Sequence, residues 1–142
     1  MSPYEPTPLT DETLDADPPL KPRRWRAKFR DALRGLKLGI RGHSSFFVHF
    51  FITALVVAGA GVLHCSVEQW CLLLLCIGGV LTAELFNSAL ETLFRGLDEA
   101  TKERARPSLD IGAGAVLLAS IVAALVGVMV FVQRLSQILR PE

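Results

Sequence analysis

The chain has 142 residues, 51% of them hydrophobic, and a mean hydropathy of +0.40. That length allows one domain at most, and the composition is too apolar for an ordinary soluble domain, so it indicates a small membrane protein. The formal net charge is only +1, but acidic and basic residues are segregated along the chain.

Residues 1–22 form an acidic, proline-rich tail. Every charged residue up to position 17 is acidic, and five of the eight prolines lie in the first twenty positions. The stretch has no apolar periodicity, so we expect it to be disordered. We do not expect a secretory signal peptide, because the first long apolar run starts only about 45 residues into the chain.

A basic segment follows the tail. Between Lys21 and Arg41 there are nine Lys or Arg and one acid, Asp31. Its apolar residues recur every three or four positions, which predicts an amphipathic helix over residues 23–41 that lies on the membrane surface. The alternative is a solvated helix that packs on the protein itself. We expect no nucleic-acid partner, because lipid headgroups are the nearer anionic surface. The apolar residues are Trp25, Phe29, Leu33, Leu36 and Ile40.

Three apolar runs come next, at residues 46–63, 70–94 and 111–132, and each is long enough to cross ~30 Å of hydrocarbon as a helix. With the surface helix they predict an all-α integral membrane protein whose membrane domain covers residues 23–134. We expect residues 95–110, which include Pro107, to form a charged connector, and residues 135–142 to form a C-terminal tail. His49, in the first run, is expected to be a buried hydrogen-bonding residue rather than a ligand.

Small residues in the third run indicate oligomerisation. They recur at four-residue spacing, which lets another helix approach closely in lipid. Three short spans also enclose little by themselves. The residues are Ala115, Ala119, Ala123 and Gly127.

The positive charges predict the orientation in the membrane. Nine Lys or Arg precede the first run, none lies in the first loop, four lie in the second loop, and two follow the third run. Because short loops rich in Lys and Arg stay in the cytoplasm, we expect the N-terminus and the second loop to be cytoplasmic.

Four polar side chains occupy the last two turns of the second run: Glu84, Asn87, Ser88 and Glu91. At about 100° per residue they fall within roughly a third of a helix circumference, so they form one polar stripe. A carboxylate at bilayer depth costs on the order of 2.5–3.5 kcal/mol, so two of them need a cation, a partner or water. Their place at the end of the run predicts a position near the cytoplasmic headgroup boundary.

The polar stripe suits phosphoryl transfer to a lipid. Glu84 and Glu91 are two turns apart, about 10 Å, so they can hold different parts of one substrate. Carboxylates beside a basic loop suit Mg²⁺ that carries a phosphorylated ligand. One carboxylate can also accept a proton from a lipid hydroxyl that attacks phosphorus. These features together indicate an ATP-dependent lipid kinase.

Structural roles stay open for the same residues. For Glu91, the alternative is a structural ion pair with Arg95, which lies four residues later. Asn87 and Ser88 would serve equally as hydrogen bonds between helices. Asp110, just before the third run, is either a helix N-cap or a functional group.

The polar stripe resembles the signature of the small prokaryotic diacylglycerol kinase family, which also includes undecaprenol kinases. The segment Glu84-Leu-Phe-Asn87-Ser88-Ala89-Leu-Glu91 is similar to that family's Glu-x-x-Asn-[Ser/Thr]-Ala-x-Glu pattern. The similarity extends from about Arg34 to Val132. Supporting stretches are Gly35-Leu36-Lys37, the pair Phe46-x-x-His49, and Asp110-Ile-Gly-Ala-Gly-Ala-Val-Leu-Leu.

This resemblance implies a homotrimer in the bacterial inner membrane, with an active site shared between neighbouring protomers. It implies Mg²⁺ and ATP as cofactor and phosphoryl donor, and diacylglycerol or undecaprenol as the lipid acceptor, in phospholipid or lipid-carrier recycling. Carried over to matching positions, the catalytic residues would be Glu84 as general base, Asn87 and Asp110. Nucleotide binding would involve Lys37, Arg41, Asn87 and Asp110, and metal binding would involve Glu91 and His43.

The chain departs from the family pattern at four places. Gly42-His43 stands where the family usually has Asn-Glu, whose Glu binds metal, and imidazole is a poor magnesium ligand. Phe47 and Leu109 replace basic residues, and Arg95 replaces a frequent Asp. One alternative is therefore a bundle that binds lipid or nucleotide without turnover. Another is an ion-conducting trimer, which the lack of a continuous polar path in the first and third runs disfavours.

Overall fold

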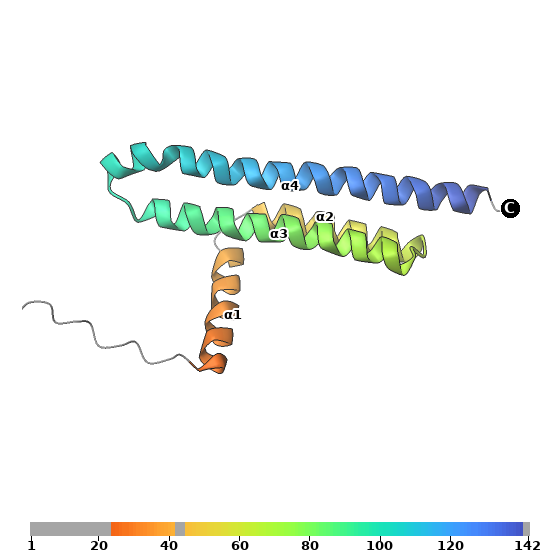
Figure 1. Cartoon of the computed structure of the whole chain (residues 1–142), viewed down its shortest axis with the longest axis horizontal. Coiled ribbons are helices and arrows are strands. Elements are labelled where there is room, and N and C mark those ends of the chain that lie inside the picture. The colour runs from red at the N-terminus through yellow and green to blue at the C-terminus, as the bar shows by residue number, and fades with distance from the viewer. Residues whose placement is uncertain (1–23, 42–44, 141–142) are drawn as a thin grey trace, which may run out of the picture.

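The computed structural model describes residues 24–41 and 45–140. In these ranges the chain is helical and has no strand (Figure 1). The expected disorder of residues 1–22 and the metal-binding role of His43 fall outside the described residues. The helices are α1 (Trp25–Arg41), α2 (Ser45–Val62), α3 (Val67–Arg95) and α4 (Glu99–Leu139).

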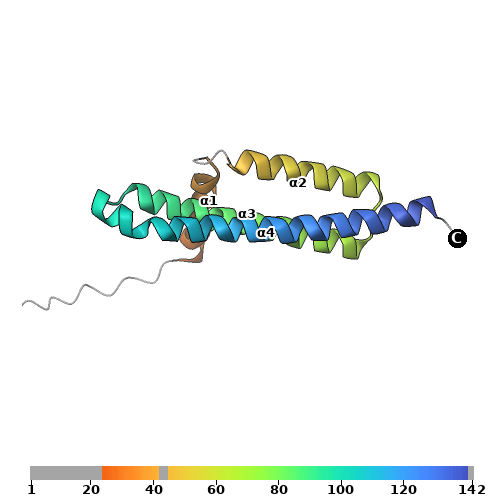
Figure 2. The ribbon, with the colours of Figure 1, turned by 90° about the horizontal axis from the view of Figure 1, so that it is seen from above.

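Helices α2, α3 and α4 run side by side along the long axis of the molecule, as Figures 1 and 2 show. All three are long and apolar enough to cross a membrane. The predicted class, an all-α protein with three membrane-spanning helices, is thereby confirmed. At about 1.5 Å per residue, α2 with its 18 residues is about 27 Å long, whereas α4 with its 41 residues is about 61 Å long.

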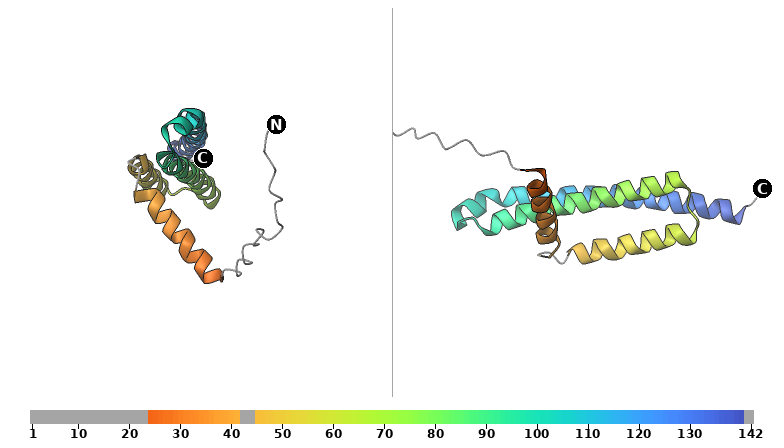
Figure 3. Two further views of the ribbon diagram at one scale, coloured as in Figure 1. Left: turned by 90° about the vertical axis from the view of Figure 1, so that its left-hand side faces the viewer. Right: turned by 90° about the horizontal axis from the view of Figure 1, so that it is seen from below.

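Helix α1 leaves this bundle at a steep angle, which is clearest in Figure 3. Its predicted apolar side is not buried by the rest of the chain, because Trp25 is 85% exposed and Phe29 is 68% exposed. Within the described part of a single chain only the C-terminal end of α1 packs on another helix, α3. An apolar side that faces outward on a basic helix is typical of helices that lie in a membrane interface.

The turn between α2 and α3 is closed by specific hydrogen bonds. His64 adopts a positive φ of 49°, which reverses the chain after α2. Ser66 and Gln69 then form a capping box that satisfies free N–H groups at the start of α3. At the same end of the molecule, the Nε of Arg134 on α4 donates to the carbonyl of Leu63 at 2.8 Å. This bond ties the end of α4 to the turn.

The segment 95–110 differs from the expected connector. Only residues 96–98 connect α3 to α4, and α4 continues through Pro107 to Leu139, into the expected C-terminal tail. Asp98 is the N-cap, and hydrogen bonds from the hydroxyl and the N–H of Thr101 lower the pKa of its carboxyl group. Pro107 is tolerated at an exposed position, where water can satisfy the carbonyl that loses its helical partner.

The packed interior of a single chain is small. Ala60, Leu73 and Val130 form a buried cluster where α2, α3 and α4 meet, and Val56 and Phe131 pack around it. Most large apolar side chains of the three spans are exposed. Since contiguous apolar surface of this extent is unfavourable in water, it suits contact with lipid or with other helices.

Candidate functional site

The polar stripe lies on the side of α3 that faces the other helices. Glu84 and Ser88 are buried, and Asn87 and Glu91 are half-buried. Burial by neighbouring helices places these polar groups inside the protein rather than against lipid, as expected for ionisable residues in a membrane-spanning segment.

Glu84 is held from α2. The side chain of Ser45 donates a hydrogen bond to its Oε1, and Nε2 of His49 lies 3.8 Å from its Oε2. The residue is only 3% exposed. Ser45 and His49 are four residues apart, so they share the face of α2 that meets α3. Both oxygens of this carboxylate therefore face a partner on one neighbouring helix.

The C-terminal end of α1 reaches α3 at the residue after Glu84. A β-carbon added at Gly39 would stand 2.7 Å from Cδ2 of Leu85, so only glycine fits this close approach without a shift. Lys37 and Arg41 are exposed. Each lies two positions from Gly39, about 200° around the helix, so both point away from α3 on a common side.

One turn beyond Glu84, the end of α3 carries a second hydrogen-bonded group. Nδ2 of Asn87 donates to Oε1 of Glu91 at 3.1 Å, and Arg95 pairs with Oε2 of Glu91 at 3.3 Å. The ion pair that the i,i+4 spacing predicted is thus present. Asn87 bonds within its own helix here rather than between helices.

Helix α4 meets the polar stripe at Gly112, but Asp110 does not join it. A β-carbon at Gly112 would stand 2.7 Å from Oδ1 of Asn87. Asp110 lies two residues earlier, about 200° around α4, and is exposed, so it points away from α3. It lies eleven residues inside α4 and is not an N-cap, a position that belongs to Asp98.

Ser88 is the one side chain of the polar stripe that lacks a hydrogen-bond partner within the described residues. It is 1% exposed, and its Oγ has no hydrogen-bond partner among the residues that the structure describes. The interhelical hydrogen bond suggested by its position is therefore not formed within this part of the chain.

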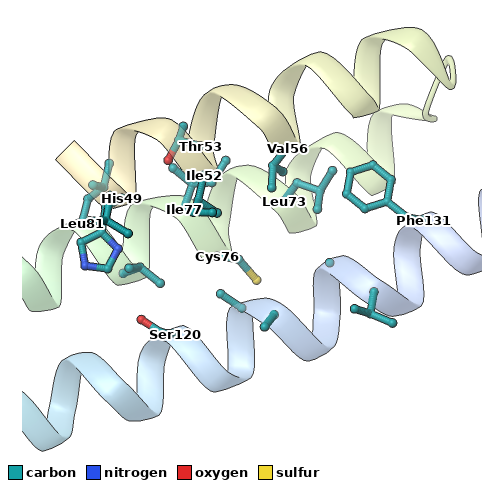
Figure 4. Close-up of a pocket in the computed structure, with 16 residues that line it drawn as sticks. His49, Ile52, Thr53, Val56, Leu73, Cys76, Ile77, Leu81, Ser120 and Phe131 are labelled. Carbon is teal, nitrogen blue, oxygen red and sulfur yellow. The ribbon is translucent and has the colours of Figure 1, made fainter. Parts of the chain in front are cut away.

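An apolar cleft begins beside Glu84. It has a volume of about 460 Å³ and lies between α2, α3 and α4. Figure 4 shows the ring of His49 pointing from α2 into this cleft near Leu81 and Ser120, with Phe131 at the opposite end. The volume is within the range of small-ligand sites, roughly 300–1,000 Å³. His49 both lines this cleft and faces Glu84, so it lies between the buried carboxylate and the apolar space along the spans.

The described residues fit a metal that arrives with a nucleotide better than a resident metal. No group of three His, Cys, Asp or Glu side chains gathers anywhere in residues 24–41 and 45–140. Glu91 offers one carboxylate, already bonded by Asn87 and Arg95. Mg²⁺ typically takes one or two protein carboxylates and completes its shell with phosphate and water, so this donor set fits nucleotide-borne Mg²⁺.

Sequence reasoning missed the two α2 partners of Glu84. The expected first apolar run begins at residue 46 and so excludes Ser45, and His49 was expected to be a buried hydrogen-bonding residue without a specified partner. The available signal was their i,i+4 spacing in a helix that otherwise has few polar groups. Which helix they would face depends on tertiary packing, which the sequence pattern does not reveal.

The chain is similar in sequence to known proteins over most of its length. A family model described as "Prokaryotic diacylglycerol kinase" matches residues 30–131. The undecaprenol kinase of Bacillus subtilis (strain 168) is 26% identical over 112 residues, which cover 79% of this chain and 91% of that protein. The diacylglycerol kinase of Synechocystis sp. (strain ATCC 27184 / PCC 6803 / Kazusa) is 32% identical over 119 residues, covering 79% of this chain and 68% of that protein. No solved structure matches significantly.

Proposed function

The chain belongs to the prokaryotic diacylglycerol kinase family and is a lipid kinase, and we propose that it transfers the γ-phosphoryl group of ATP to diacylglycerol or undecaprenol at the cytoplasmic face of the bacterial inner membrane. The product would serve phospholipid or lipid-carrier recycling. The observation that carries this proposal is the buried carboxylate of Glu84, held by Ser45 and His49 beside an apolar cleft.

Helix lengths support a site at the headgroup boundary. Helix α2, about 27 Å long, is just long enough to cross ~30 Å of hydrocarbon, and Glu84 is bonded by its first residue, Ser45. Glu84 therefore lies at the level where α2 enters the membrane. The last eleven residues of α3 and the first part of α4 extend beyond that level. Helix α1, whose C-terminal end meets α3 there and which projects from the bundle at a steep angle, suits a position in the interface (Figure 3).

The distribution of Lys and Arg along the chain supports a cytoplasmic position for the site. The end of α2 that bears Ser45 follows the segment with nine Lys or Arg, and the opposite loop has none. Under the positive-inside tendency the N-terminus is cytoplasmic and the site opens to the compartment that contains ATP.

In the proposed reaction Glu84 is the general base. The lipid hydroxyl oxygen forms a bond to the γ-phosphorus while the bond from that phosphorus to the bridging oxygen breaks, and ADP leaves with the electron pair. The hydroxyl proton passes to Glu84. A carboxylate whose two oxygens face Ser45 and His49 is positioned by its neighbours, which suits a general base.

Other residues position the nucleotide in this proposal. Asn87 holds Glu91, and Glu91, with His43, would bind Mg²⁺, which when bound neutralises phosphate charge. Lys37 and Arg41 form a basic pair on the free side of α1 for the phosphates. Asp110 points away from the Asn87 of the same chain, so an active-site role for Asp110 requires the polar stripe of a neighbouring protomer. A homotrimer with shared sites is therefore part of the proposal.

The test is a phosphorylation assay with the full-length protein in mixed micelles. Labelled ATP and Mg²⁺ are supplied with diacylglycerol or with undecaprenol, and labelled lipid is separated and counted. We expect phosphate on at least one acceptor, dependent on a divalent ion. If neither lipid is labelled with any divalent ion, the protein is a non-catalytic relative and the proposal fails.

A further inference from the structure

The two neighbours of Glu84 on α2 differ in one chemical respect. Ser45 can only donate or accept a hydrogen bond, whereas His49 can also carry a proton. Its Nε2 is 3.8 Å from Oε2 of Glu84, close enough for direct electrostatic interaction. The reaction proposed above does not use this imidazole.

A proton taken up by Glu84 has no direct exit to water. The side chain of Glu84 is 4% exposed, whereas that of His49 is 19% exposed and lines the apolar cleft (Figure 4). Each turnover leaves one proton on the base, which must lose it before the next turnover. Histidine is the side chain that ordinarily gains and loses a proton between about pH 5 and 8, so it is suited to carry that proton away.

We propose that His49 is the proton-sharing and positioning partner of Glu84 in this kinase. The inference rests on the proposed function. After Glu84 has received the hydroxyl proton, an unprotonated nitrogen of His49 takes it from the carboxyl group, which becomes a carboxylate again. The resulting imidazolium then releases the proton to water at the headgroup boundary, one turn of α2 away. Ser45 holds the other carboxylate oxygen, so Glu84 keeps its orientation during this exchange.

Among the described groups around His49, Glu84 is the carboxylate that its ring faces. From α3 the ring faces Glu84 and shares the cleft with the free thiol of Cys76. From α4 the cleft receives only the hydroxyl of Ser120 as a polar side chain, and no charged residue of α4 lines it among the described residues. Arg41, at the end of α1, is exposed.

The experiment uses two substitutions, His49→Ala and His49→Gln, in the full-length protein, with Thr53→Val as the matched control. Thr53 lies one turn further along α2 and lines the same cleft, but within the described residues it makes no hydrogen bond with Glu84. For each variant, kcat and KM for ATP and for the lipid are measured across pH 5 to 8. Imidazole is then added to His49→Ala, because the neighbouring cleft has room for it.

We expect both His49 variants to lose about 10²-fold in kcat, with little change in either KM. The limb of the pH–rate profile between about pH 5 and 8 should disappear. Added imidazole should raise the rate of His49→Ala in proportion to its concentration. It should not raise the rate of Glu84→Gln. Thr53→Val should keep the rate and the pH profile of the wild type.

Two results would overturn the inference. One is a His49→Gln enzyme with the wild-type rate and pH profile. The other is a loss of rate that imidazole does not restore and that leaves the shape of the pH profile unchanged, since that would give His49 a packing role only. Circular dichroism identifies a variant that has failed to fold, in which case the other variant decides. If the wild type itself labels no lipid, it is the proposed function that fails.

Discussion

Gly112 of α4 lies against Asn87 of α3 so closely that a β-carbon added at position 112 would stand 2.7 Å from Oδ1 of Asn87. The amide nitrogen of the same Asn87 donates to Glu91 at 3.1 Å. One side chain thus links the backbone of α4 to a carboxylate of α3. The position of α4 and the geometry of the candidate site are therefore mutually dependent.

Replacing Gly112 with Ala should damage the site. The added methyl group would also stand 2.9 Å from Cδ1 of Leu90, so either Asn87 or α4 must move. We expect kcat to fall about 10- to 100-fold, because small displacements of positioning groups have effects of that size. The free energy of unfolding should fall by about 1–3 kcal/mol. Lipid phosphorylation and thermal melting in the same micelles measure the two effects.

Gly114→Ala is the control for this substitution. It lies on the same helix and a β-carbon there would meet nothing within 4 Å. It should keep activity and stability near those of the wild type. Equal effects of the two substitutions would mean that helix flexibility, and not the contact with Asn87, decides the outcome.

Glu84→Gln should nearly abolish turnover while the protein stays folded. The amide keeps the shape of the side chain but cannot accept the hydroxyl proton, so we expect kcat to fall by about 10²- to 10⁴-fold. Melting temperature should stay close to that of the wild type, because the amide keeps the shape of the side chain and can still accept the hydrogen bond from Ser45. Glu103→Gln, at an exposed position on α4, is the control and should change neither quantity. An active Glu84→Gln enzyme would disprove the role of Glu84 as base.

Ser88→Ala should stabilise the protein. The Oγ of Ser88 is buried and has no partner within the described ranges, and an unsatisfied buried hydroxyl costs about 1–3 kcal/mol. We therefore expect a rise of about 1 kcal/mol in the free energy of unfolding. Ser108→Ala, at an exposed position, should have almost no effect. A clear loss of stability in Ser88→Ala would contradict the prediction and show that the assembled protein supplies a partner for this hydroxyl.

Asp98 should give the start of α4 a stability that depends on pH. Hydrogen bonds from Thr101 lower the pKa of its carboxyl group below the ordinary value of 3.8. The folded-state pKa is thus the lower one, so the contribution is present above pH 3.8 and is lost as the pH falls through the lowered pKa. Asp98→Ala should lower the melting temperature at pH 7, and this difference should shrink in stronger acid. A difference that stays constant with pH would rule out the charged cap.

The sequence predicted the fold well because hydrophobic runs of membrane length leave few alternatives. A helix over most of residues 23–41 and the three spans are all present, and the polar stripe lies on one face of α3. The extent of α4 was wrong, since Pro107 and its charged neighbours are typical of a connector. An N-cap at Asp98 and packing of α4 on α3 outweighed that local preference.

The candidate site was only partly predictable. Spacing along one helix showed that Glu84, Asn87 and Glu91 share a side, and it predicted the pair between Glu91 and Arg95. It could not show that Ser45 and His49 approach Glu84, because contacts between helices depend on how whole faces pack. It also did not show that Asp110 turns away from Asn87, which follows from the close approach at Gly112.

Helix α4 is about twice as long as hydrocarbon is thick, so roughly half of it extends beyond the hydrocarbon. At one end, α4 and α3 form a helical hairpin that is closed by the short turn at residues 96–98. A single cysteine introduced at Leu97, in a chain whose own cysteines have been replaced, would carry a label far from lipid. Labelling of sealed vesicles from one side would then report directly which way the protein is inserted.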